Sequence, residues 1–181
     1  ESSEYGDFIG LDDLFTEQPR VLDGMIDVYK TWATTGIDGF RIDTVKHVSY
    51  EQARNFCGAI KEFAVNLGKR DFFLVGEVPD DDFANRYLNA VGRNLNATLD
   101  ISGGRLALRD LSRGLSDPSP YFNGFDVGSA PLGSHRNLGD KLMSVLDDHD
   151  HVYGEKLRFA VRAVNDHQVA AATAIQLLTL G

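Results

Sequence analysis

The sequence predicts an α/β fold built on a parallel sheet, and three observations support this prediction. Segments with apolar residues at helical spacing alternate with short apolar runs, at about 30 to 40 residues per unit. No GxGxxG or GxxxxGK[ST] motif follows any of these runs, so a phosphate-binding doubly wound sheet has no support. Acidic residues stand at the ends of three predicted strands, where a (β/α)₈ barrel carries its catalytic side chains. A barrel is therefore the better prediction.

The first unit is predicted from a broad apolar stripe and a short run after it. Apolar residues at helical spacing predict a helix over 19–35, which ends at Gly36. A strand over 37–43 follows. Because successive strand residues point to opposite faces, Arg41 and Asp43 share one face of this strand.

The second unit repeats this arrangement. Residues 50–67 fit an amphipathic helix, and Cys57 falls on its apolar side, so we expect this cysteine in the core. Residues 72–78 form a nearly continuous apolar run, as in a strand buried on both faces. Glu77 stands at the end of this run.

The rest of the chain is predicted to continue the alternation. Asn165 is the expected N-cap of the last helix. We expect a helical segment over 79–94, a strand over 97–101 and a helix over 105–115. A long loop over 116–140, which can hold one short helix, should follow. The chain should then form a strand over 142–146 and a terminal helix over 168–180.

Composition and charge exclude several classes of function. The 181 residues are 43% hydrophobic, as in a globular protein, and the formal net charge is -9. No Lys/Arg-rich run occurs, so we expect neither a nucleic-acid partner nor an anionic membrane surface. No apolar run reaches the about 20 residues of a membrane span. The single cysteine, Cys57, excludes an internal disulfide framework and a zinc ribbon.

Three carboxylates at predicted strand ends suggest the chemistry. Taken singly, each of Asp43, Glu77 and Asp150 is more often a helix cap or an ion-pair partner. Together they suit glycosidic cleavage by a nucleophile and a general acid/base, with the third acid stabilising developing positive charge. Arg41 would favour the ionised form of Asp43, and the apolar run before Glu77 would raise the pKa of that acid.

Three motifs carry a family resemblance. Residues 39–47 (GFRIDTVKH), 73–78 (FLVGEV) and 145–150 (VLDDHD) resemble the second, third and fourth conserved regions of the α-amylase superfamily, glycoside hydrolase family 13. Residues 10–19 (GLDDLFTEQP) are similar to the family's loop before its third helix. A whole barrel takes about 250 residues. The resemblance therefore implies an internal piece of one catalytic barrel domain over 1–181, approximately strands four to seven with flanking helices.

The resemblance also implies roles for single residues. Asp43 corresponds to the nucleophile, Glu77 to the general acid/base and Asp150 to the third acid, which binds sugar hydroxyls in the transition state. His149 matches a histidine that contacts the sugar at the cleavage point. Lys46 and His47 match a pair on the leaving-group side, and Arg41 is assigned with these residues to substrate binding. The family usually has Asn where Asp148 stands, so the role of Asp148 stays open.

The implied function is a retaining α-glycosidase that acts on α-glucans or oligosaccharides through a covalent glycosyl-enzyme. We assign no metal ligand and no cofactor in this segment. The family's first region, whose side chains help to hold a structural calcium, does not occur in the sequence, so calcium remains an expectation for a full-length protein. We expect the isolated segment to be inactive, and a secreted or periplasmic location is favoured for the parent protein.

Two alternatives stay open. A non-catalytic barrel homologue with a carbohydrate-binding or partner role would usually have lost one of the three acids, and all three are present. A metal-dependent barrel hydrolase could instead use the Asp/His run at 147–151. Because strand residues alternate faces, at most two or three of these side chains could converge. Activity in the presence of a chelator would separate these hypotheses.

Overall fold

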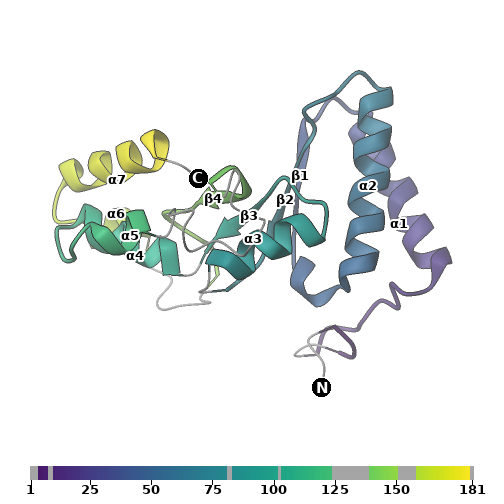
Figure 1. The fold of residues 1–181 in the computed structure, drawn as a ribbon, viewed down its shortest axis with the longest axis horizontal. Coiled ribbons are helices and arrows are strands. Elements are labelled where there is room, and N and C mark those ends of the chain that lie inside the picture. The colour runs from purple at the N-terminus through teal and green to yellow at the C-terminus, as the bar shows by residue number, and fades with distance from the viewer. Residues whose placement is uncertain are drawn as a thin grey trace. The chain divides into compact units, whose positions relative to one another are not determined.

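The computed structural model describes residues 4–7, 10–80, 83–101, 103–123, 139–150 and 158–179. The chain forms two compact units (Figure 1). The first unit contains Glu1–Glu77 and Asn89–Asn96, and the second contains Val78–Leu88 and Ala97–Gly181.

The first unit is a parallel strand pair with two helices. Strands β1 and β2 pair in parallel, with Gly39 opposite Phe73 and Ile42 opposite Gly76. Helices α1 and α2 pack side by side (Figure 1). The elements are α1 (Pro19–Ala33), β1 (Gly39–Ile42), a 3-10 turn (Val45–His47), α2 (Tyr50–Asn66) and β2 (Phe73–Glu77).

Local sequence explains these elements. Helix α1 begins at Pro19, where a missing N–H costs nothing, and the Ser49 side chain caps α2 by accepting from the N–H of Gln52. A Cβ at Gly39 would lie 2.1 Å from the Phe73 carbonyl oxygen, so only glycine lets the two strands approach here. Cys57 is fully buried, as the sequence predicted.

The second unit contains the other strand pair. Strands β3 and β4 pair in parallel, with Thr98 opposite Leu142 and Asp100 opposite Ser144. Helix α4 packs against α7 (Figure 1). Its elements are β3 (Ala97–Asp100), α4 (Gly103–Ser112), α5 (Ser119–Asn123), a 3-10 turn (Gly139–Lys141), β4 (Leu142–Ser144), α6 (Phe159–Arg162) and α7 (Asp166–Leu178), and α3 (Phe83–Gly92) begins in this unit.

The predicted alternation of helices and strands is confirmed, with one parallel strand pair in each unit. Asn165 caps α7 by accepting from the N–H of Gln168, as predicted. The short helix α6 was not predicted, because four residues carry no periodicity. Most of the loop predicted at 116–140 lies outside the described residues, apart from α5 and its flanks. Within the described ranges, no helix combines the length and the apolarity that crossing a bilayer requires.

Candidate active site

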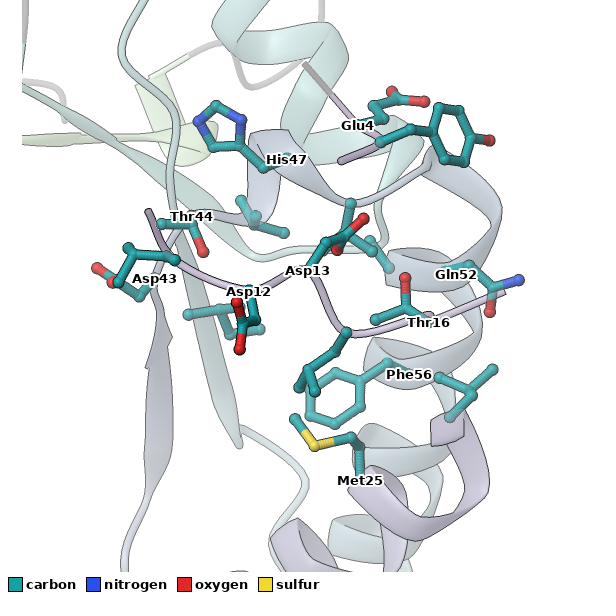
Figure 2. A pocket seen from close by; sticks show the side chains of 18 of the residues that line it. Glu4, Asp12, Asp13, Thr16, Met25, Asp43, Thr44, His47, Gln52 and Phe56 are labelled. Carbon is teal, nitrogen blue, oxygen red and sulfur yellow. The ribbon is translucent and has the colours of Figure 1, made fainter. Parts of the chain in front are cut away.

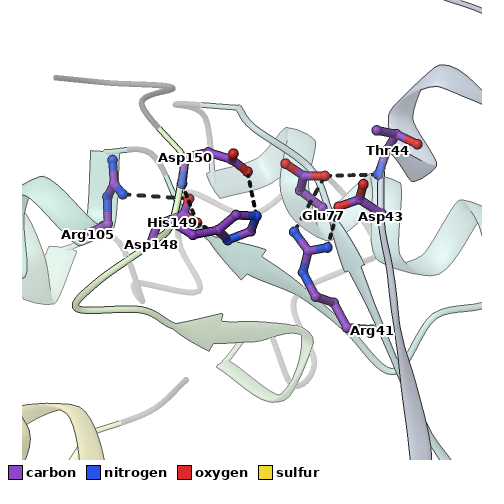
Figure 3. A network of polar contacts seen from close by, with 8 residues as sticks. All are labelled: Arg41, Asp43, Thr44, Glu77, Arg105, Asp148, His149 and Asp150. Carbon is purple, nitrogen blue, oxygen red and sulfur yellow. Dashed lines mark hydrogen bonds and ion pairs between the residues drawn. The ribbon is translucent and has the colours of Figure 1, made fainter. Parts of the chain in front are cut away.

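Two of the three predicted acids meet at the carboxyl ends of β1 and β2. Asp43 directly follows β1, and Glu77 is the last residue of β2. Because the two strands are parallel and Ile42 lies opposite Gly76, both acids emerge at the same end of the strand pair. Figure 3 shows Arg41 directed toward both of them. The sequence predicted this arrangement from strand ends alone.

Arg41 pairs with both carboxylates. Its guanidinium contacts Asp43 Oδ1, and a second nitrogen lies 3.7 Å from Glu77 Oε2. The two acids differ sharply in solvent access, since the Asp43 side chain is 64% exposed and that of Glu77 only 10%. One acid can therefore be reached directly from solvent, whereas the other is enclosed.

Thr44 contributes through its backbone. Its N–H donates to Glu77 Oε2 at 2.9 Å, and its carbonyl oxygen accepts from the N–H of His47 at 2.8 Å. Thr44 has φ 48° and ψ 23°, in the left-handed region that β-branched residues rarely occupy. This conformation turns the chain from β1 toward the 3-10 turn and aims the N–H at Glu77.

The surroundings of Glu77 raise its pKa above the ordinary value. Burial is the largest cause, because it disfavours the charged form. The Thr44 N–H acts in the opposite direction, the hydrogen bond and charge of Asp43 raise the pKa further, and Arg41 lowers it. The net direction is the one that the sequence predicted for a general acid.

A cavity of about 790 Å³ opens beside these residues. Figure 2 shows Asp43, Thr44 and His47 at one end of the cavity and Met25 and Phe56 at the other. The N-terminal segment supplies further acidic groups to the lining, which include Asp12 and Asp13. Lys46 belongs to the same 3-10 turn as His47, and both side chains are half-buried.

The third predicted acid lies in the second unit, after β4. Asp150 and Asp148 flank His149, whose Nδ1 is 3.1 Å from Asp148 Oδ1 and whose Nε2 is 3.2 Å from Asp150 Oδ2 (Figure 3). The Asp150 N–H also donates to Asp148 Oδ1 at 3.2 Å. Asp147 accepts from the N–H of Phe159 at 2.6 Å. The run therefore forms a compact turn held by its own side chains.

Asp148, whose role the sequence left open, anchors this turn. Its side chain is only 7% exposed, and its Oδ2 lies 3.7 Å from a guanidinium nitrogen of Arg105 on α4. Possible ligand atoms of Asp148, His149 and Asp150 lie within 4.8 Å of one another, as a cation site would require. The guanidinium beside Asp148 opposes a second cation there. His151, the last residue of the predicted run, lies outside the described residues.

Sequence reasoning missed two contributors to these arrangements. Thr44 acts through a backbone N–H, which no residue pattern reveals. Arg105 was predicted only as the start of a helix, although a charged residue on the buried side of α4 was a signal that a buried partner exists.

Comparison with known proteins decides the family. The model of the α-amylase catalytic domain matches residues 4–110, which include Asp43 and Glu77. The chain belongs to the α-amylase family. The residues matched by this model stop before the turn at 147–150, so the assignment of that turn depends on the longer similarities.

Three family relatives show the extent of the similarity. An α-amylase of Streptomyces lividans is 46% identical over 102 residues, which are 56% of this chain and 11% of that protein. A cyclomaltodextrin glucanotransferase of Bacillus licheniformis is 25% identical over all 181 residues, which are 23% of its length. The crystal structure of the Geobacillus thermoleovorans α-amylase complexed with acarbose matches 96% of this chain with a TM-score of 0.76 and 28% identity.

The chain covers 37% of that Geobacillus amylase chain, and so spans well under half of each of these family relatives. The likeness to part of an amylase structure confirms the predicted fold class, a part of a (β/α)₈ barrel.

Proposed function

We propose that this protein is a retaining α-glycosidase that acts on α-glucans, with Asp43 as nucleophile and Glu77 as general acid/base. One observation carries the proposal. A buried carboxyl group with a raised pKa and an exposed carboxylate stand at the ends of two parallel strands and pair with the same guanidinium, that of Arg41. Retaining enzymes need a close pair of carboxyl groups, because one group must attack the sugar while the other delivers a proton.

In the first step, Glu77 protonates the glycosidic oxygen as the bond to the leaving sugar breaks. Asp43 attacks the anomeric carbon and forms a glycosyl ester. Glu77 Oε2 already accepts from the Thr44 N–H and faces Arg41, so we place the acidic proton on Oε1. Arg41 supplies positive charge beside the carboxylate that attacks.

In the second step, Glu77 removes a proton from water, which attacks the anomeric carbon and releases Asp43. Esterification has by then neutralised Asp43, so one cause of the raised pKa of Glu77 is gone. Arg41 and the Thr44 N–H, which lower this pKa, remain. The same residue is therefore tuned toward an acid before the ester forms and toward a base afterwards. A second sugar in place of water would give transfer instead of hydrolysis.

The other predicted residues complete the proposal. His47 and Lys46 would contact the leaving-group side, and His149 and Asp150 would bind sugar hydroxyls. Structural calcium, a secreted or periplasmic location and the inactivity of the 181 residues alone are proposals of the same kind. The amylase and glucanotransferase names of the relatives support an α-glucan substrate.

The test replaces Asp43 with Asn in the natural protein that carries this sequence. The kcat on a maltooligosaccharide should fall on the order of 10⁴-fold while binding stays measurable, because the nucleophile's charge is lost and its shape is kept. Asp38→Asn is the matched control, since Asp38 is 98% exposed and stands just before β1. It should leave kcat within about twofold of wild type. A near-wild-type kcat for Asp43→Asn would remove the nucleophile assignment, and with it the proposed mechanism.

A further inference from the structure

Arg93 is a buried arginine that donates hydrogen bonds to the backbone of a neighbouring loop. It follows α3 and is 1% exposed. Its Nε donates to the carbonyl oxygen of Val45 at 3.0 Å, and one terminal nitrogen donates to those of Val48 at 3.2 Å and Lys46 at 3.5 Å. The other terminal nitrogen donates to Asn89 Oδ1. One side chain thus joins the end of α3 to three carbonyl groups of one loop.

The guanidinium occupies a site built for it. The centre of the Tyr50 ring, at the start of α2, lies 3.8 Å from the guanidinium carbon, a favourable cation–π distance. A Cβ at Gly92 would approach this ring to 2.4 Å, so the missing side chain makes room for it. The carbonyl oxygens and the aromatic face together hold the buried charge.

The loop that Arg93 contacts carries several of the candidate site residues. It connects β1 to α2, starts at Asp43 and Thr44, and includes Lys46 and His47. A 3-10 turn of three residues offers few internal hydrogen bonds: the His47 N–H reaches the Thr44 carbonyl at 2.8 Å, and a second bond within the turn is longer, at 3.4 Å. Arg93 therefore supplies donors that the loop itself lacks.

We propose that Arg93 is a positioning residue for the reaction: it fixes this loop so that the Thr44 N–H stays on Glu77 and His47 stays at the end of the cavity that Asp43 lines. This inference rests on the proposed function. Arg93 acts through the backbone of the loop. The charged groups recorded around Glu77 in the first unit are Arg41 and Asp43, both at the end of β1, where they pair with each other.

The inference predicts a specific change in pH dependence. The Thr44 N–H lowers the pKa of Glu77, so a loosened loop should raise that pKa further. Asp43 is held at the end of β1 by Arg41, so its effect on Glu77 should persist. The basic limb of the kcat/KM profile, which reports the general acid of the free enzyme, should then move to higher pH.

The experiment compares Arg93→Lys with Arg54→Lys in the natural protein that carries this sequence, with maltopentaose as substrate. Lysine keeps the charge but cannot supply the guanidinium fork. We expect kcat/KM to fall roughly 10- to 100-fold for Arg93→Lys, with the basic limb shifted upward. Arg54 is the control, because it is exposed and its Nε donates to the carbonyl oxygen of Gly92, the residue before Arg93, at 3.0 Å. Its profile should superimpose on that of wild type.

The position of a pH limb reports folded molecules only, so partial unfolding would lower the amplitude without moving the limb. If Arg93→Lys gives no folded protein, Asn89→Ala, which removes one acceptor of Arg93, should show a smaller shift in the same direction. An unshifted limb in the variant measured overturns the inference. Asp43→Asn in the same assay separates the two proposals: activity in that variant defeats the proposed function, whereas its inactivity together with an unshifted Arg93→Lys limb defeats only the role of Arg93.

Discussion

The two units of the chain each bury one carboxylate in their acidic cluster beside a guanidinium group, and they differ in what else surrounds it. Glu77 in the first unit has a guanidinium nitrogen of Arg41 at 3.7 Å, but the carboxyl group of Asp43 also faces it and raises its pKa. Asp148 in the second unit lies against the guanidinium of Arg105 and accepts from the Asp150 N–H. Burial alone therefore does not mark a catalytic acid. A second carboxyl group that raises the pKa, beside the guanidinium, is what separates the acid prepared to carry a proton from the one that holds a turn in place.

The largest effect should follow the loss of the first unit's acid. Glu77→Gln should lower kcat by roughly 10² to 10⁴-fold, the usual contribution of a general acid. It should leave the unfolding temperature unchanged or higher, because a neutral amide replaces a buried carboxyl group beside Asp43. Steady-state kinetics and thermal unfolding measure both quantities. A large fall in stability with kcat preserved would show that Glu77 holds the structure and does not act as the acid.

A large loss of stability should instead follow the removal of the second unit's cation. Arg105→Met leaves the Asp148 carboxylate buried without its guanidinium, and should lower the free energy of unfolding by about 3 kcal/mol. Arg113→Met, directly after α4, removes a longer and partly exposed ion pair with Asp110 and should cost at most about 1 kcal/mol. Urea unfolding compares the two. Equal losses would mean that Asp148 does not depend on Arg105.

A smaller effect concerns the pH dependence of stability. A group whose pKa is higher in the folded than in the unfolded state contributes stability that is fully present below the unfolded pKa, about 4.3 for Glu. That stability is lost as the pH rises through the folded pKa. The wild type should therefore lose stability relative to Glu77→Gln over this window, as urea titrations at a series of pH values would show. Parallel curves for the two proteins would contradict the raised pKa.

The smallest expected effect concerns metal binding at the turn of the second unit. Arg105 already neutralises Asp148, so the cluster should bind Mn²⁺ no better than a variant in which His149→Ala removes one ligand. Equilibrium dialysis of the two proteins measures this difference. A bound ion lost in the variant would revive the metal-dependent hydrolase hypothesis.

The sequence predicted those parts of the molecule that depend on local patterns. Helical spacing located α1 and α2, and the ends of the apolar runs located Asp43 and Glu77. Residues that act from a distant part of the chain escaped prediction. Arg93 reaches the loop after β1 from beyond α3, and Arg105 reaches Asp148 from α4. Such contacts depend on the packing of separate segments, which no local periodicity encodes.

The sequence also did not predict a hydrogen bond that a backbone group donates to the acid. The donor to Glu77 is the N–H of Thr44, and its direction depends on a left-handed conformation that threonine rarely adopts. Every residue type except proline carries the same N–H, so the sequence holds no sign of this contact. The position of the acid was therefore predictable, whereas the hydrogen bond that tunes it was not.

Trapping the covalent intermediate tests the central claim most directly. In the Glu77→Gln variant an activated maltosyl fluoride needs no acid to lose its leaving group, so Asp43 can still attack, but the water step lacks its base. The glycosyl-enzyme should accumulate, and mass spectrometry of the digested protein should find the added maltosyl group on the peptide that contains Asp43. A maltosyl group on a different carboxylate, or rapid turnover of the fluoride with no adduct, would contradict the assignment of Asp43 as nucleophile and Glu77 as its acid/base.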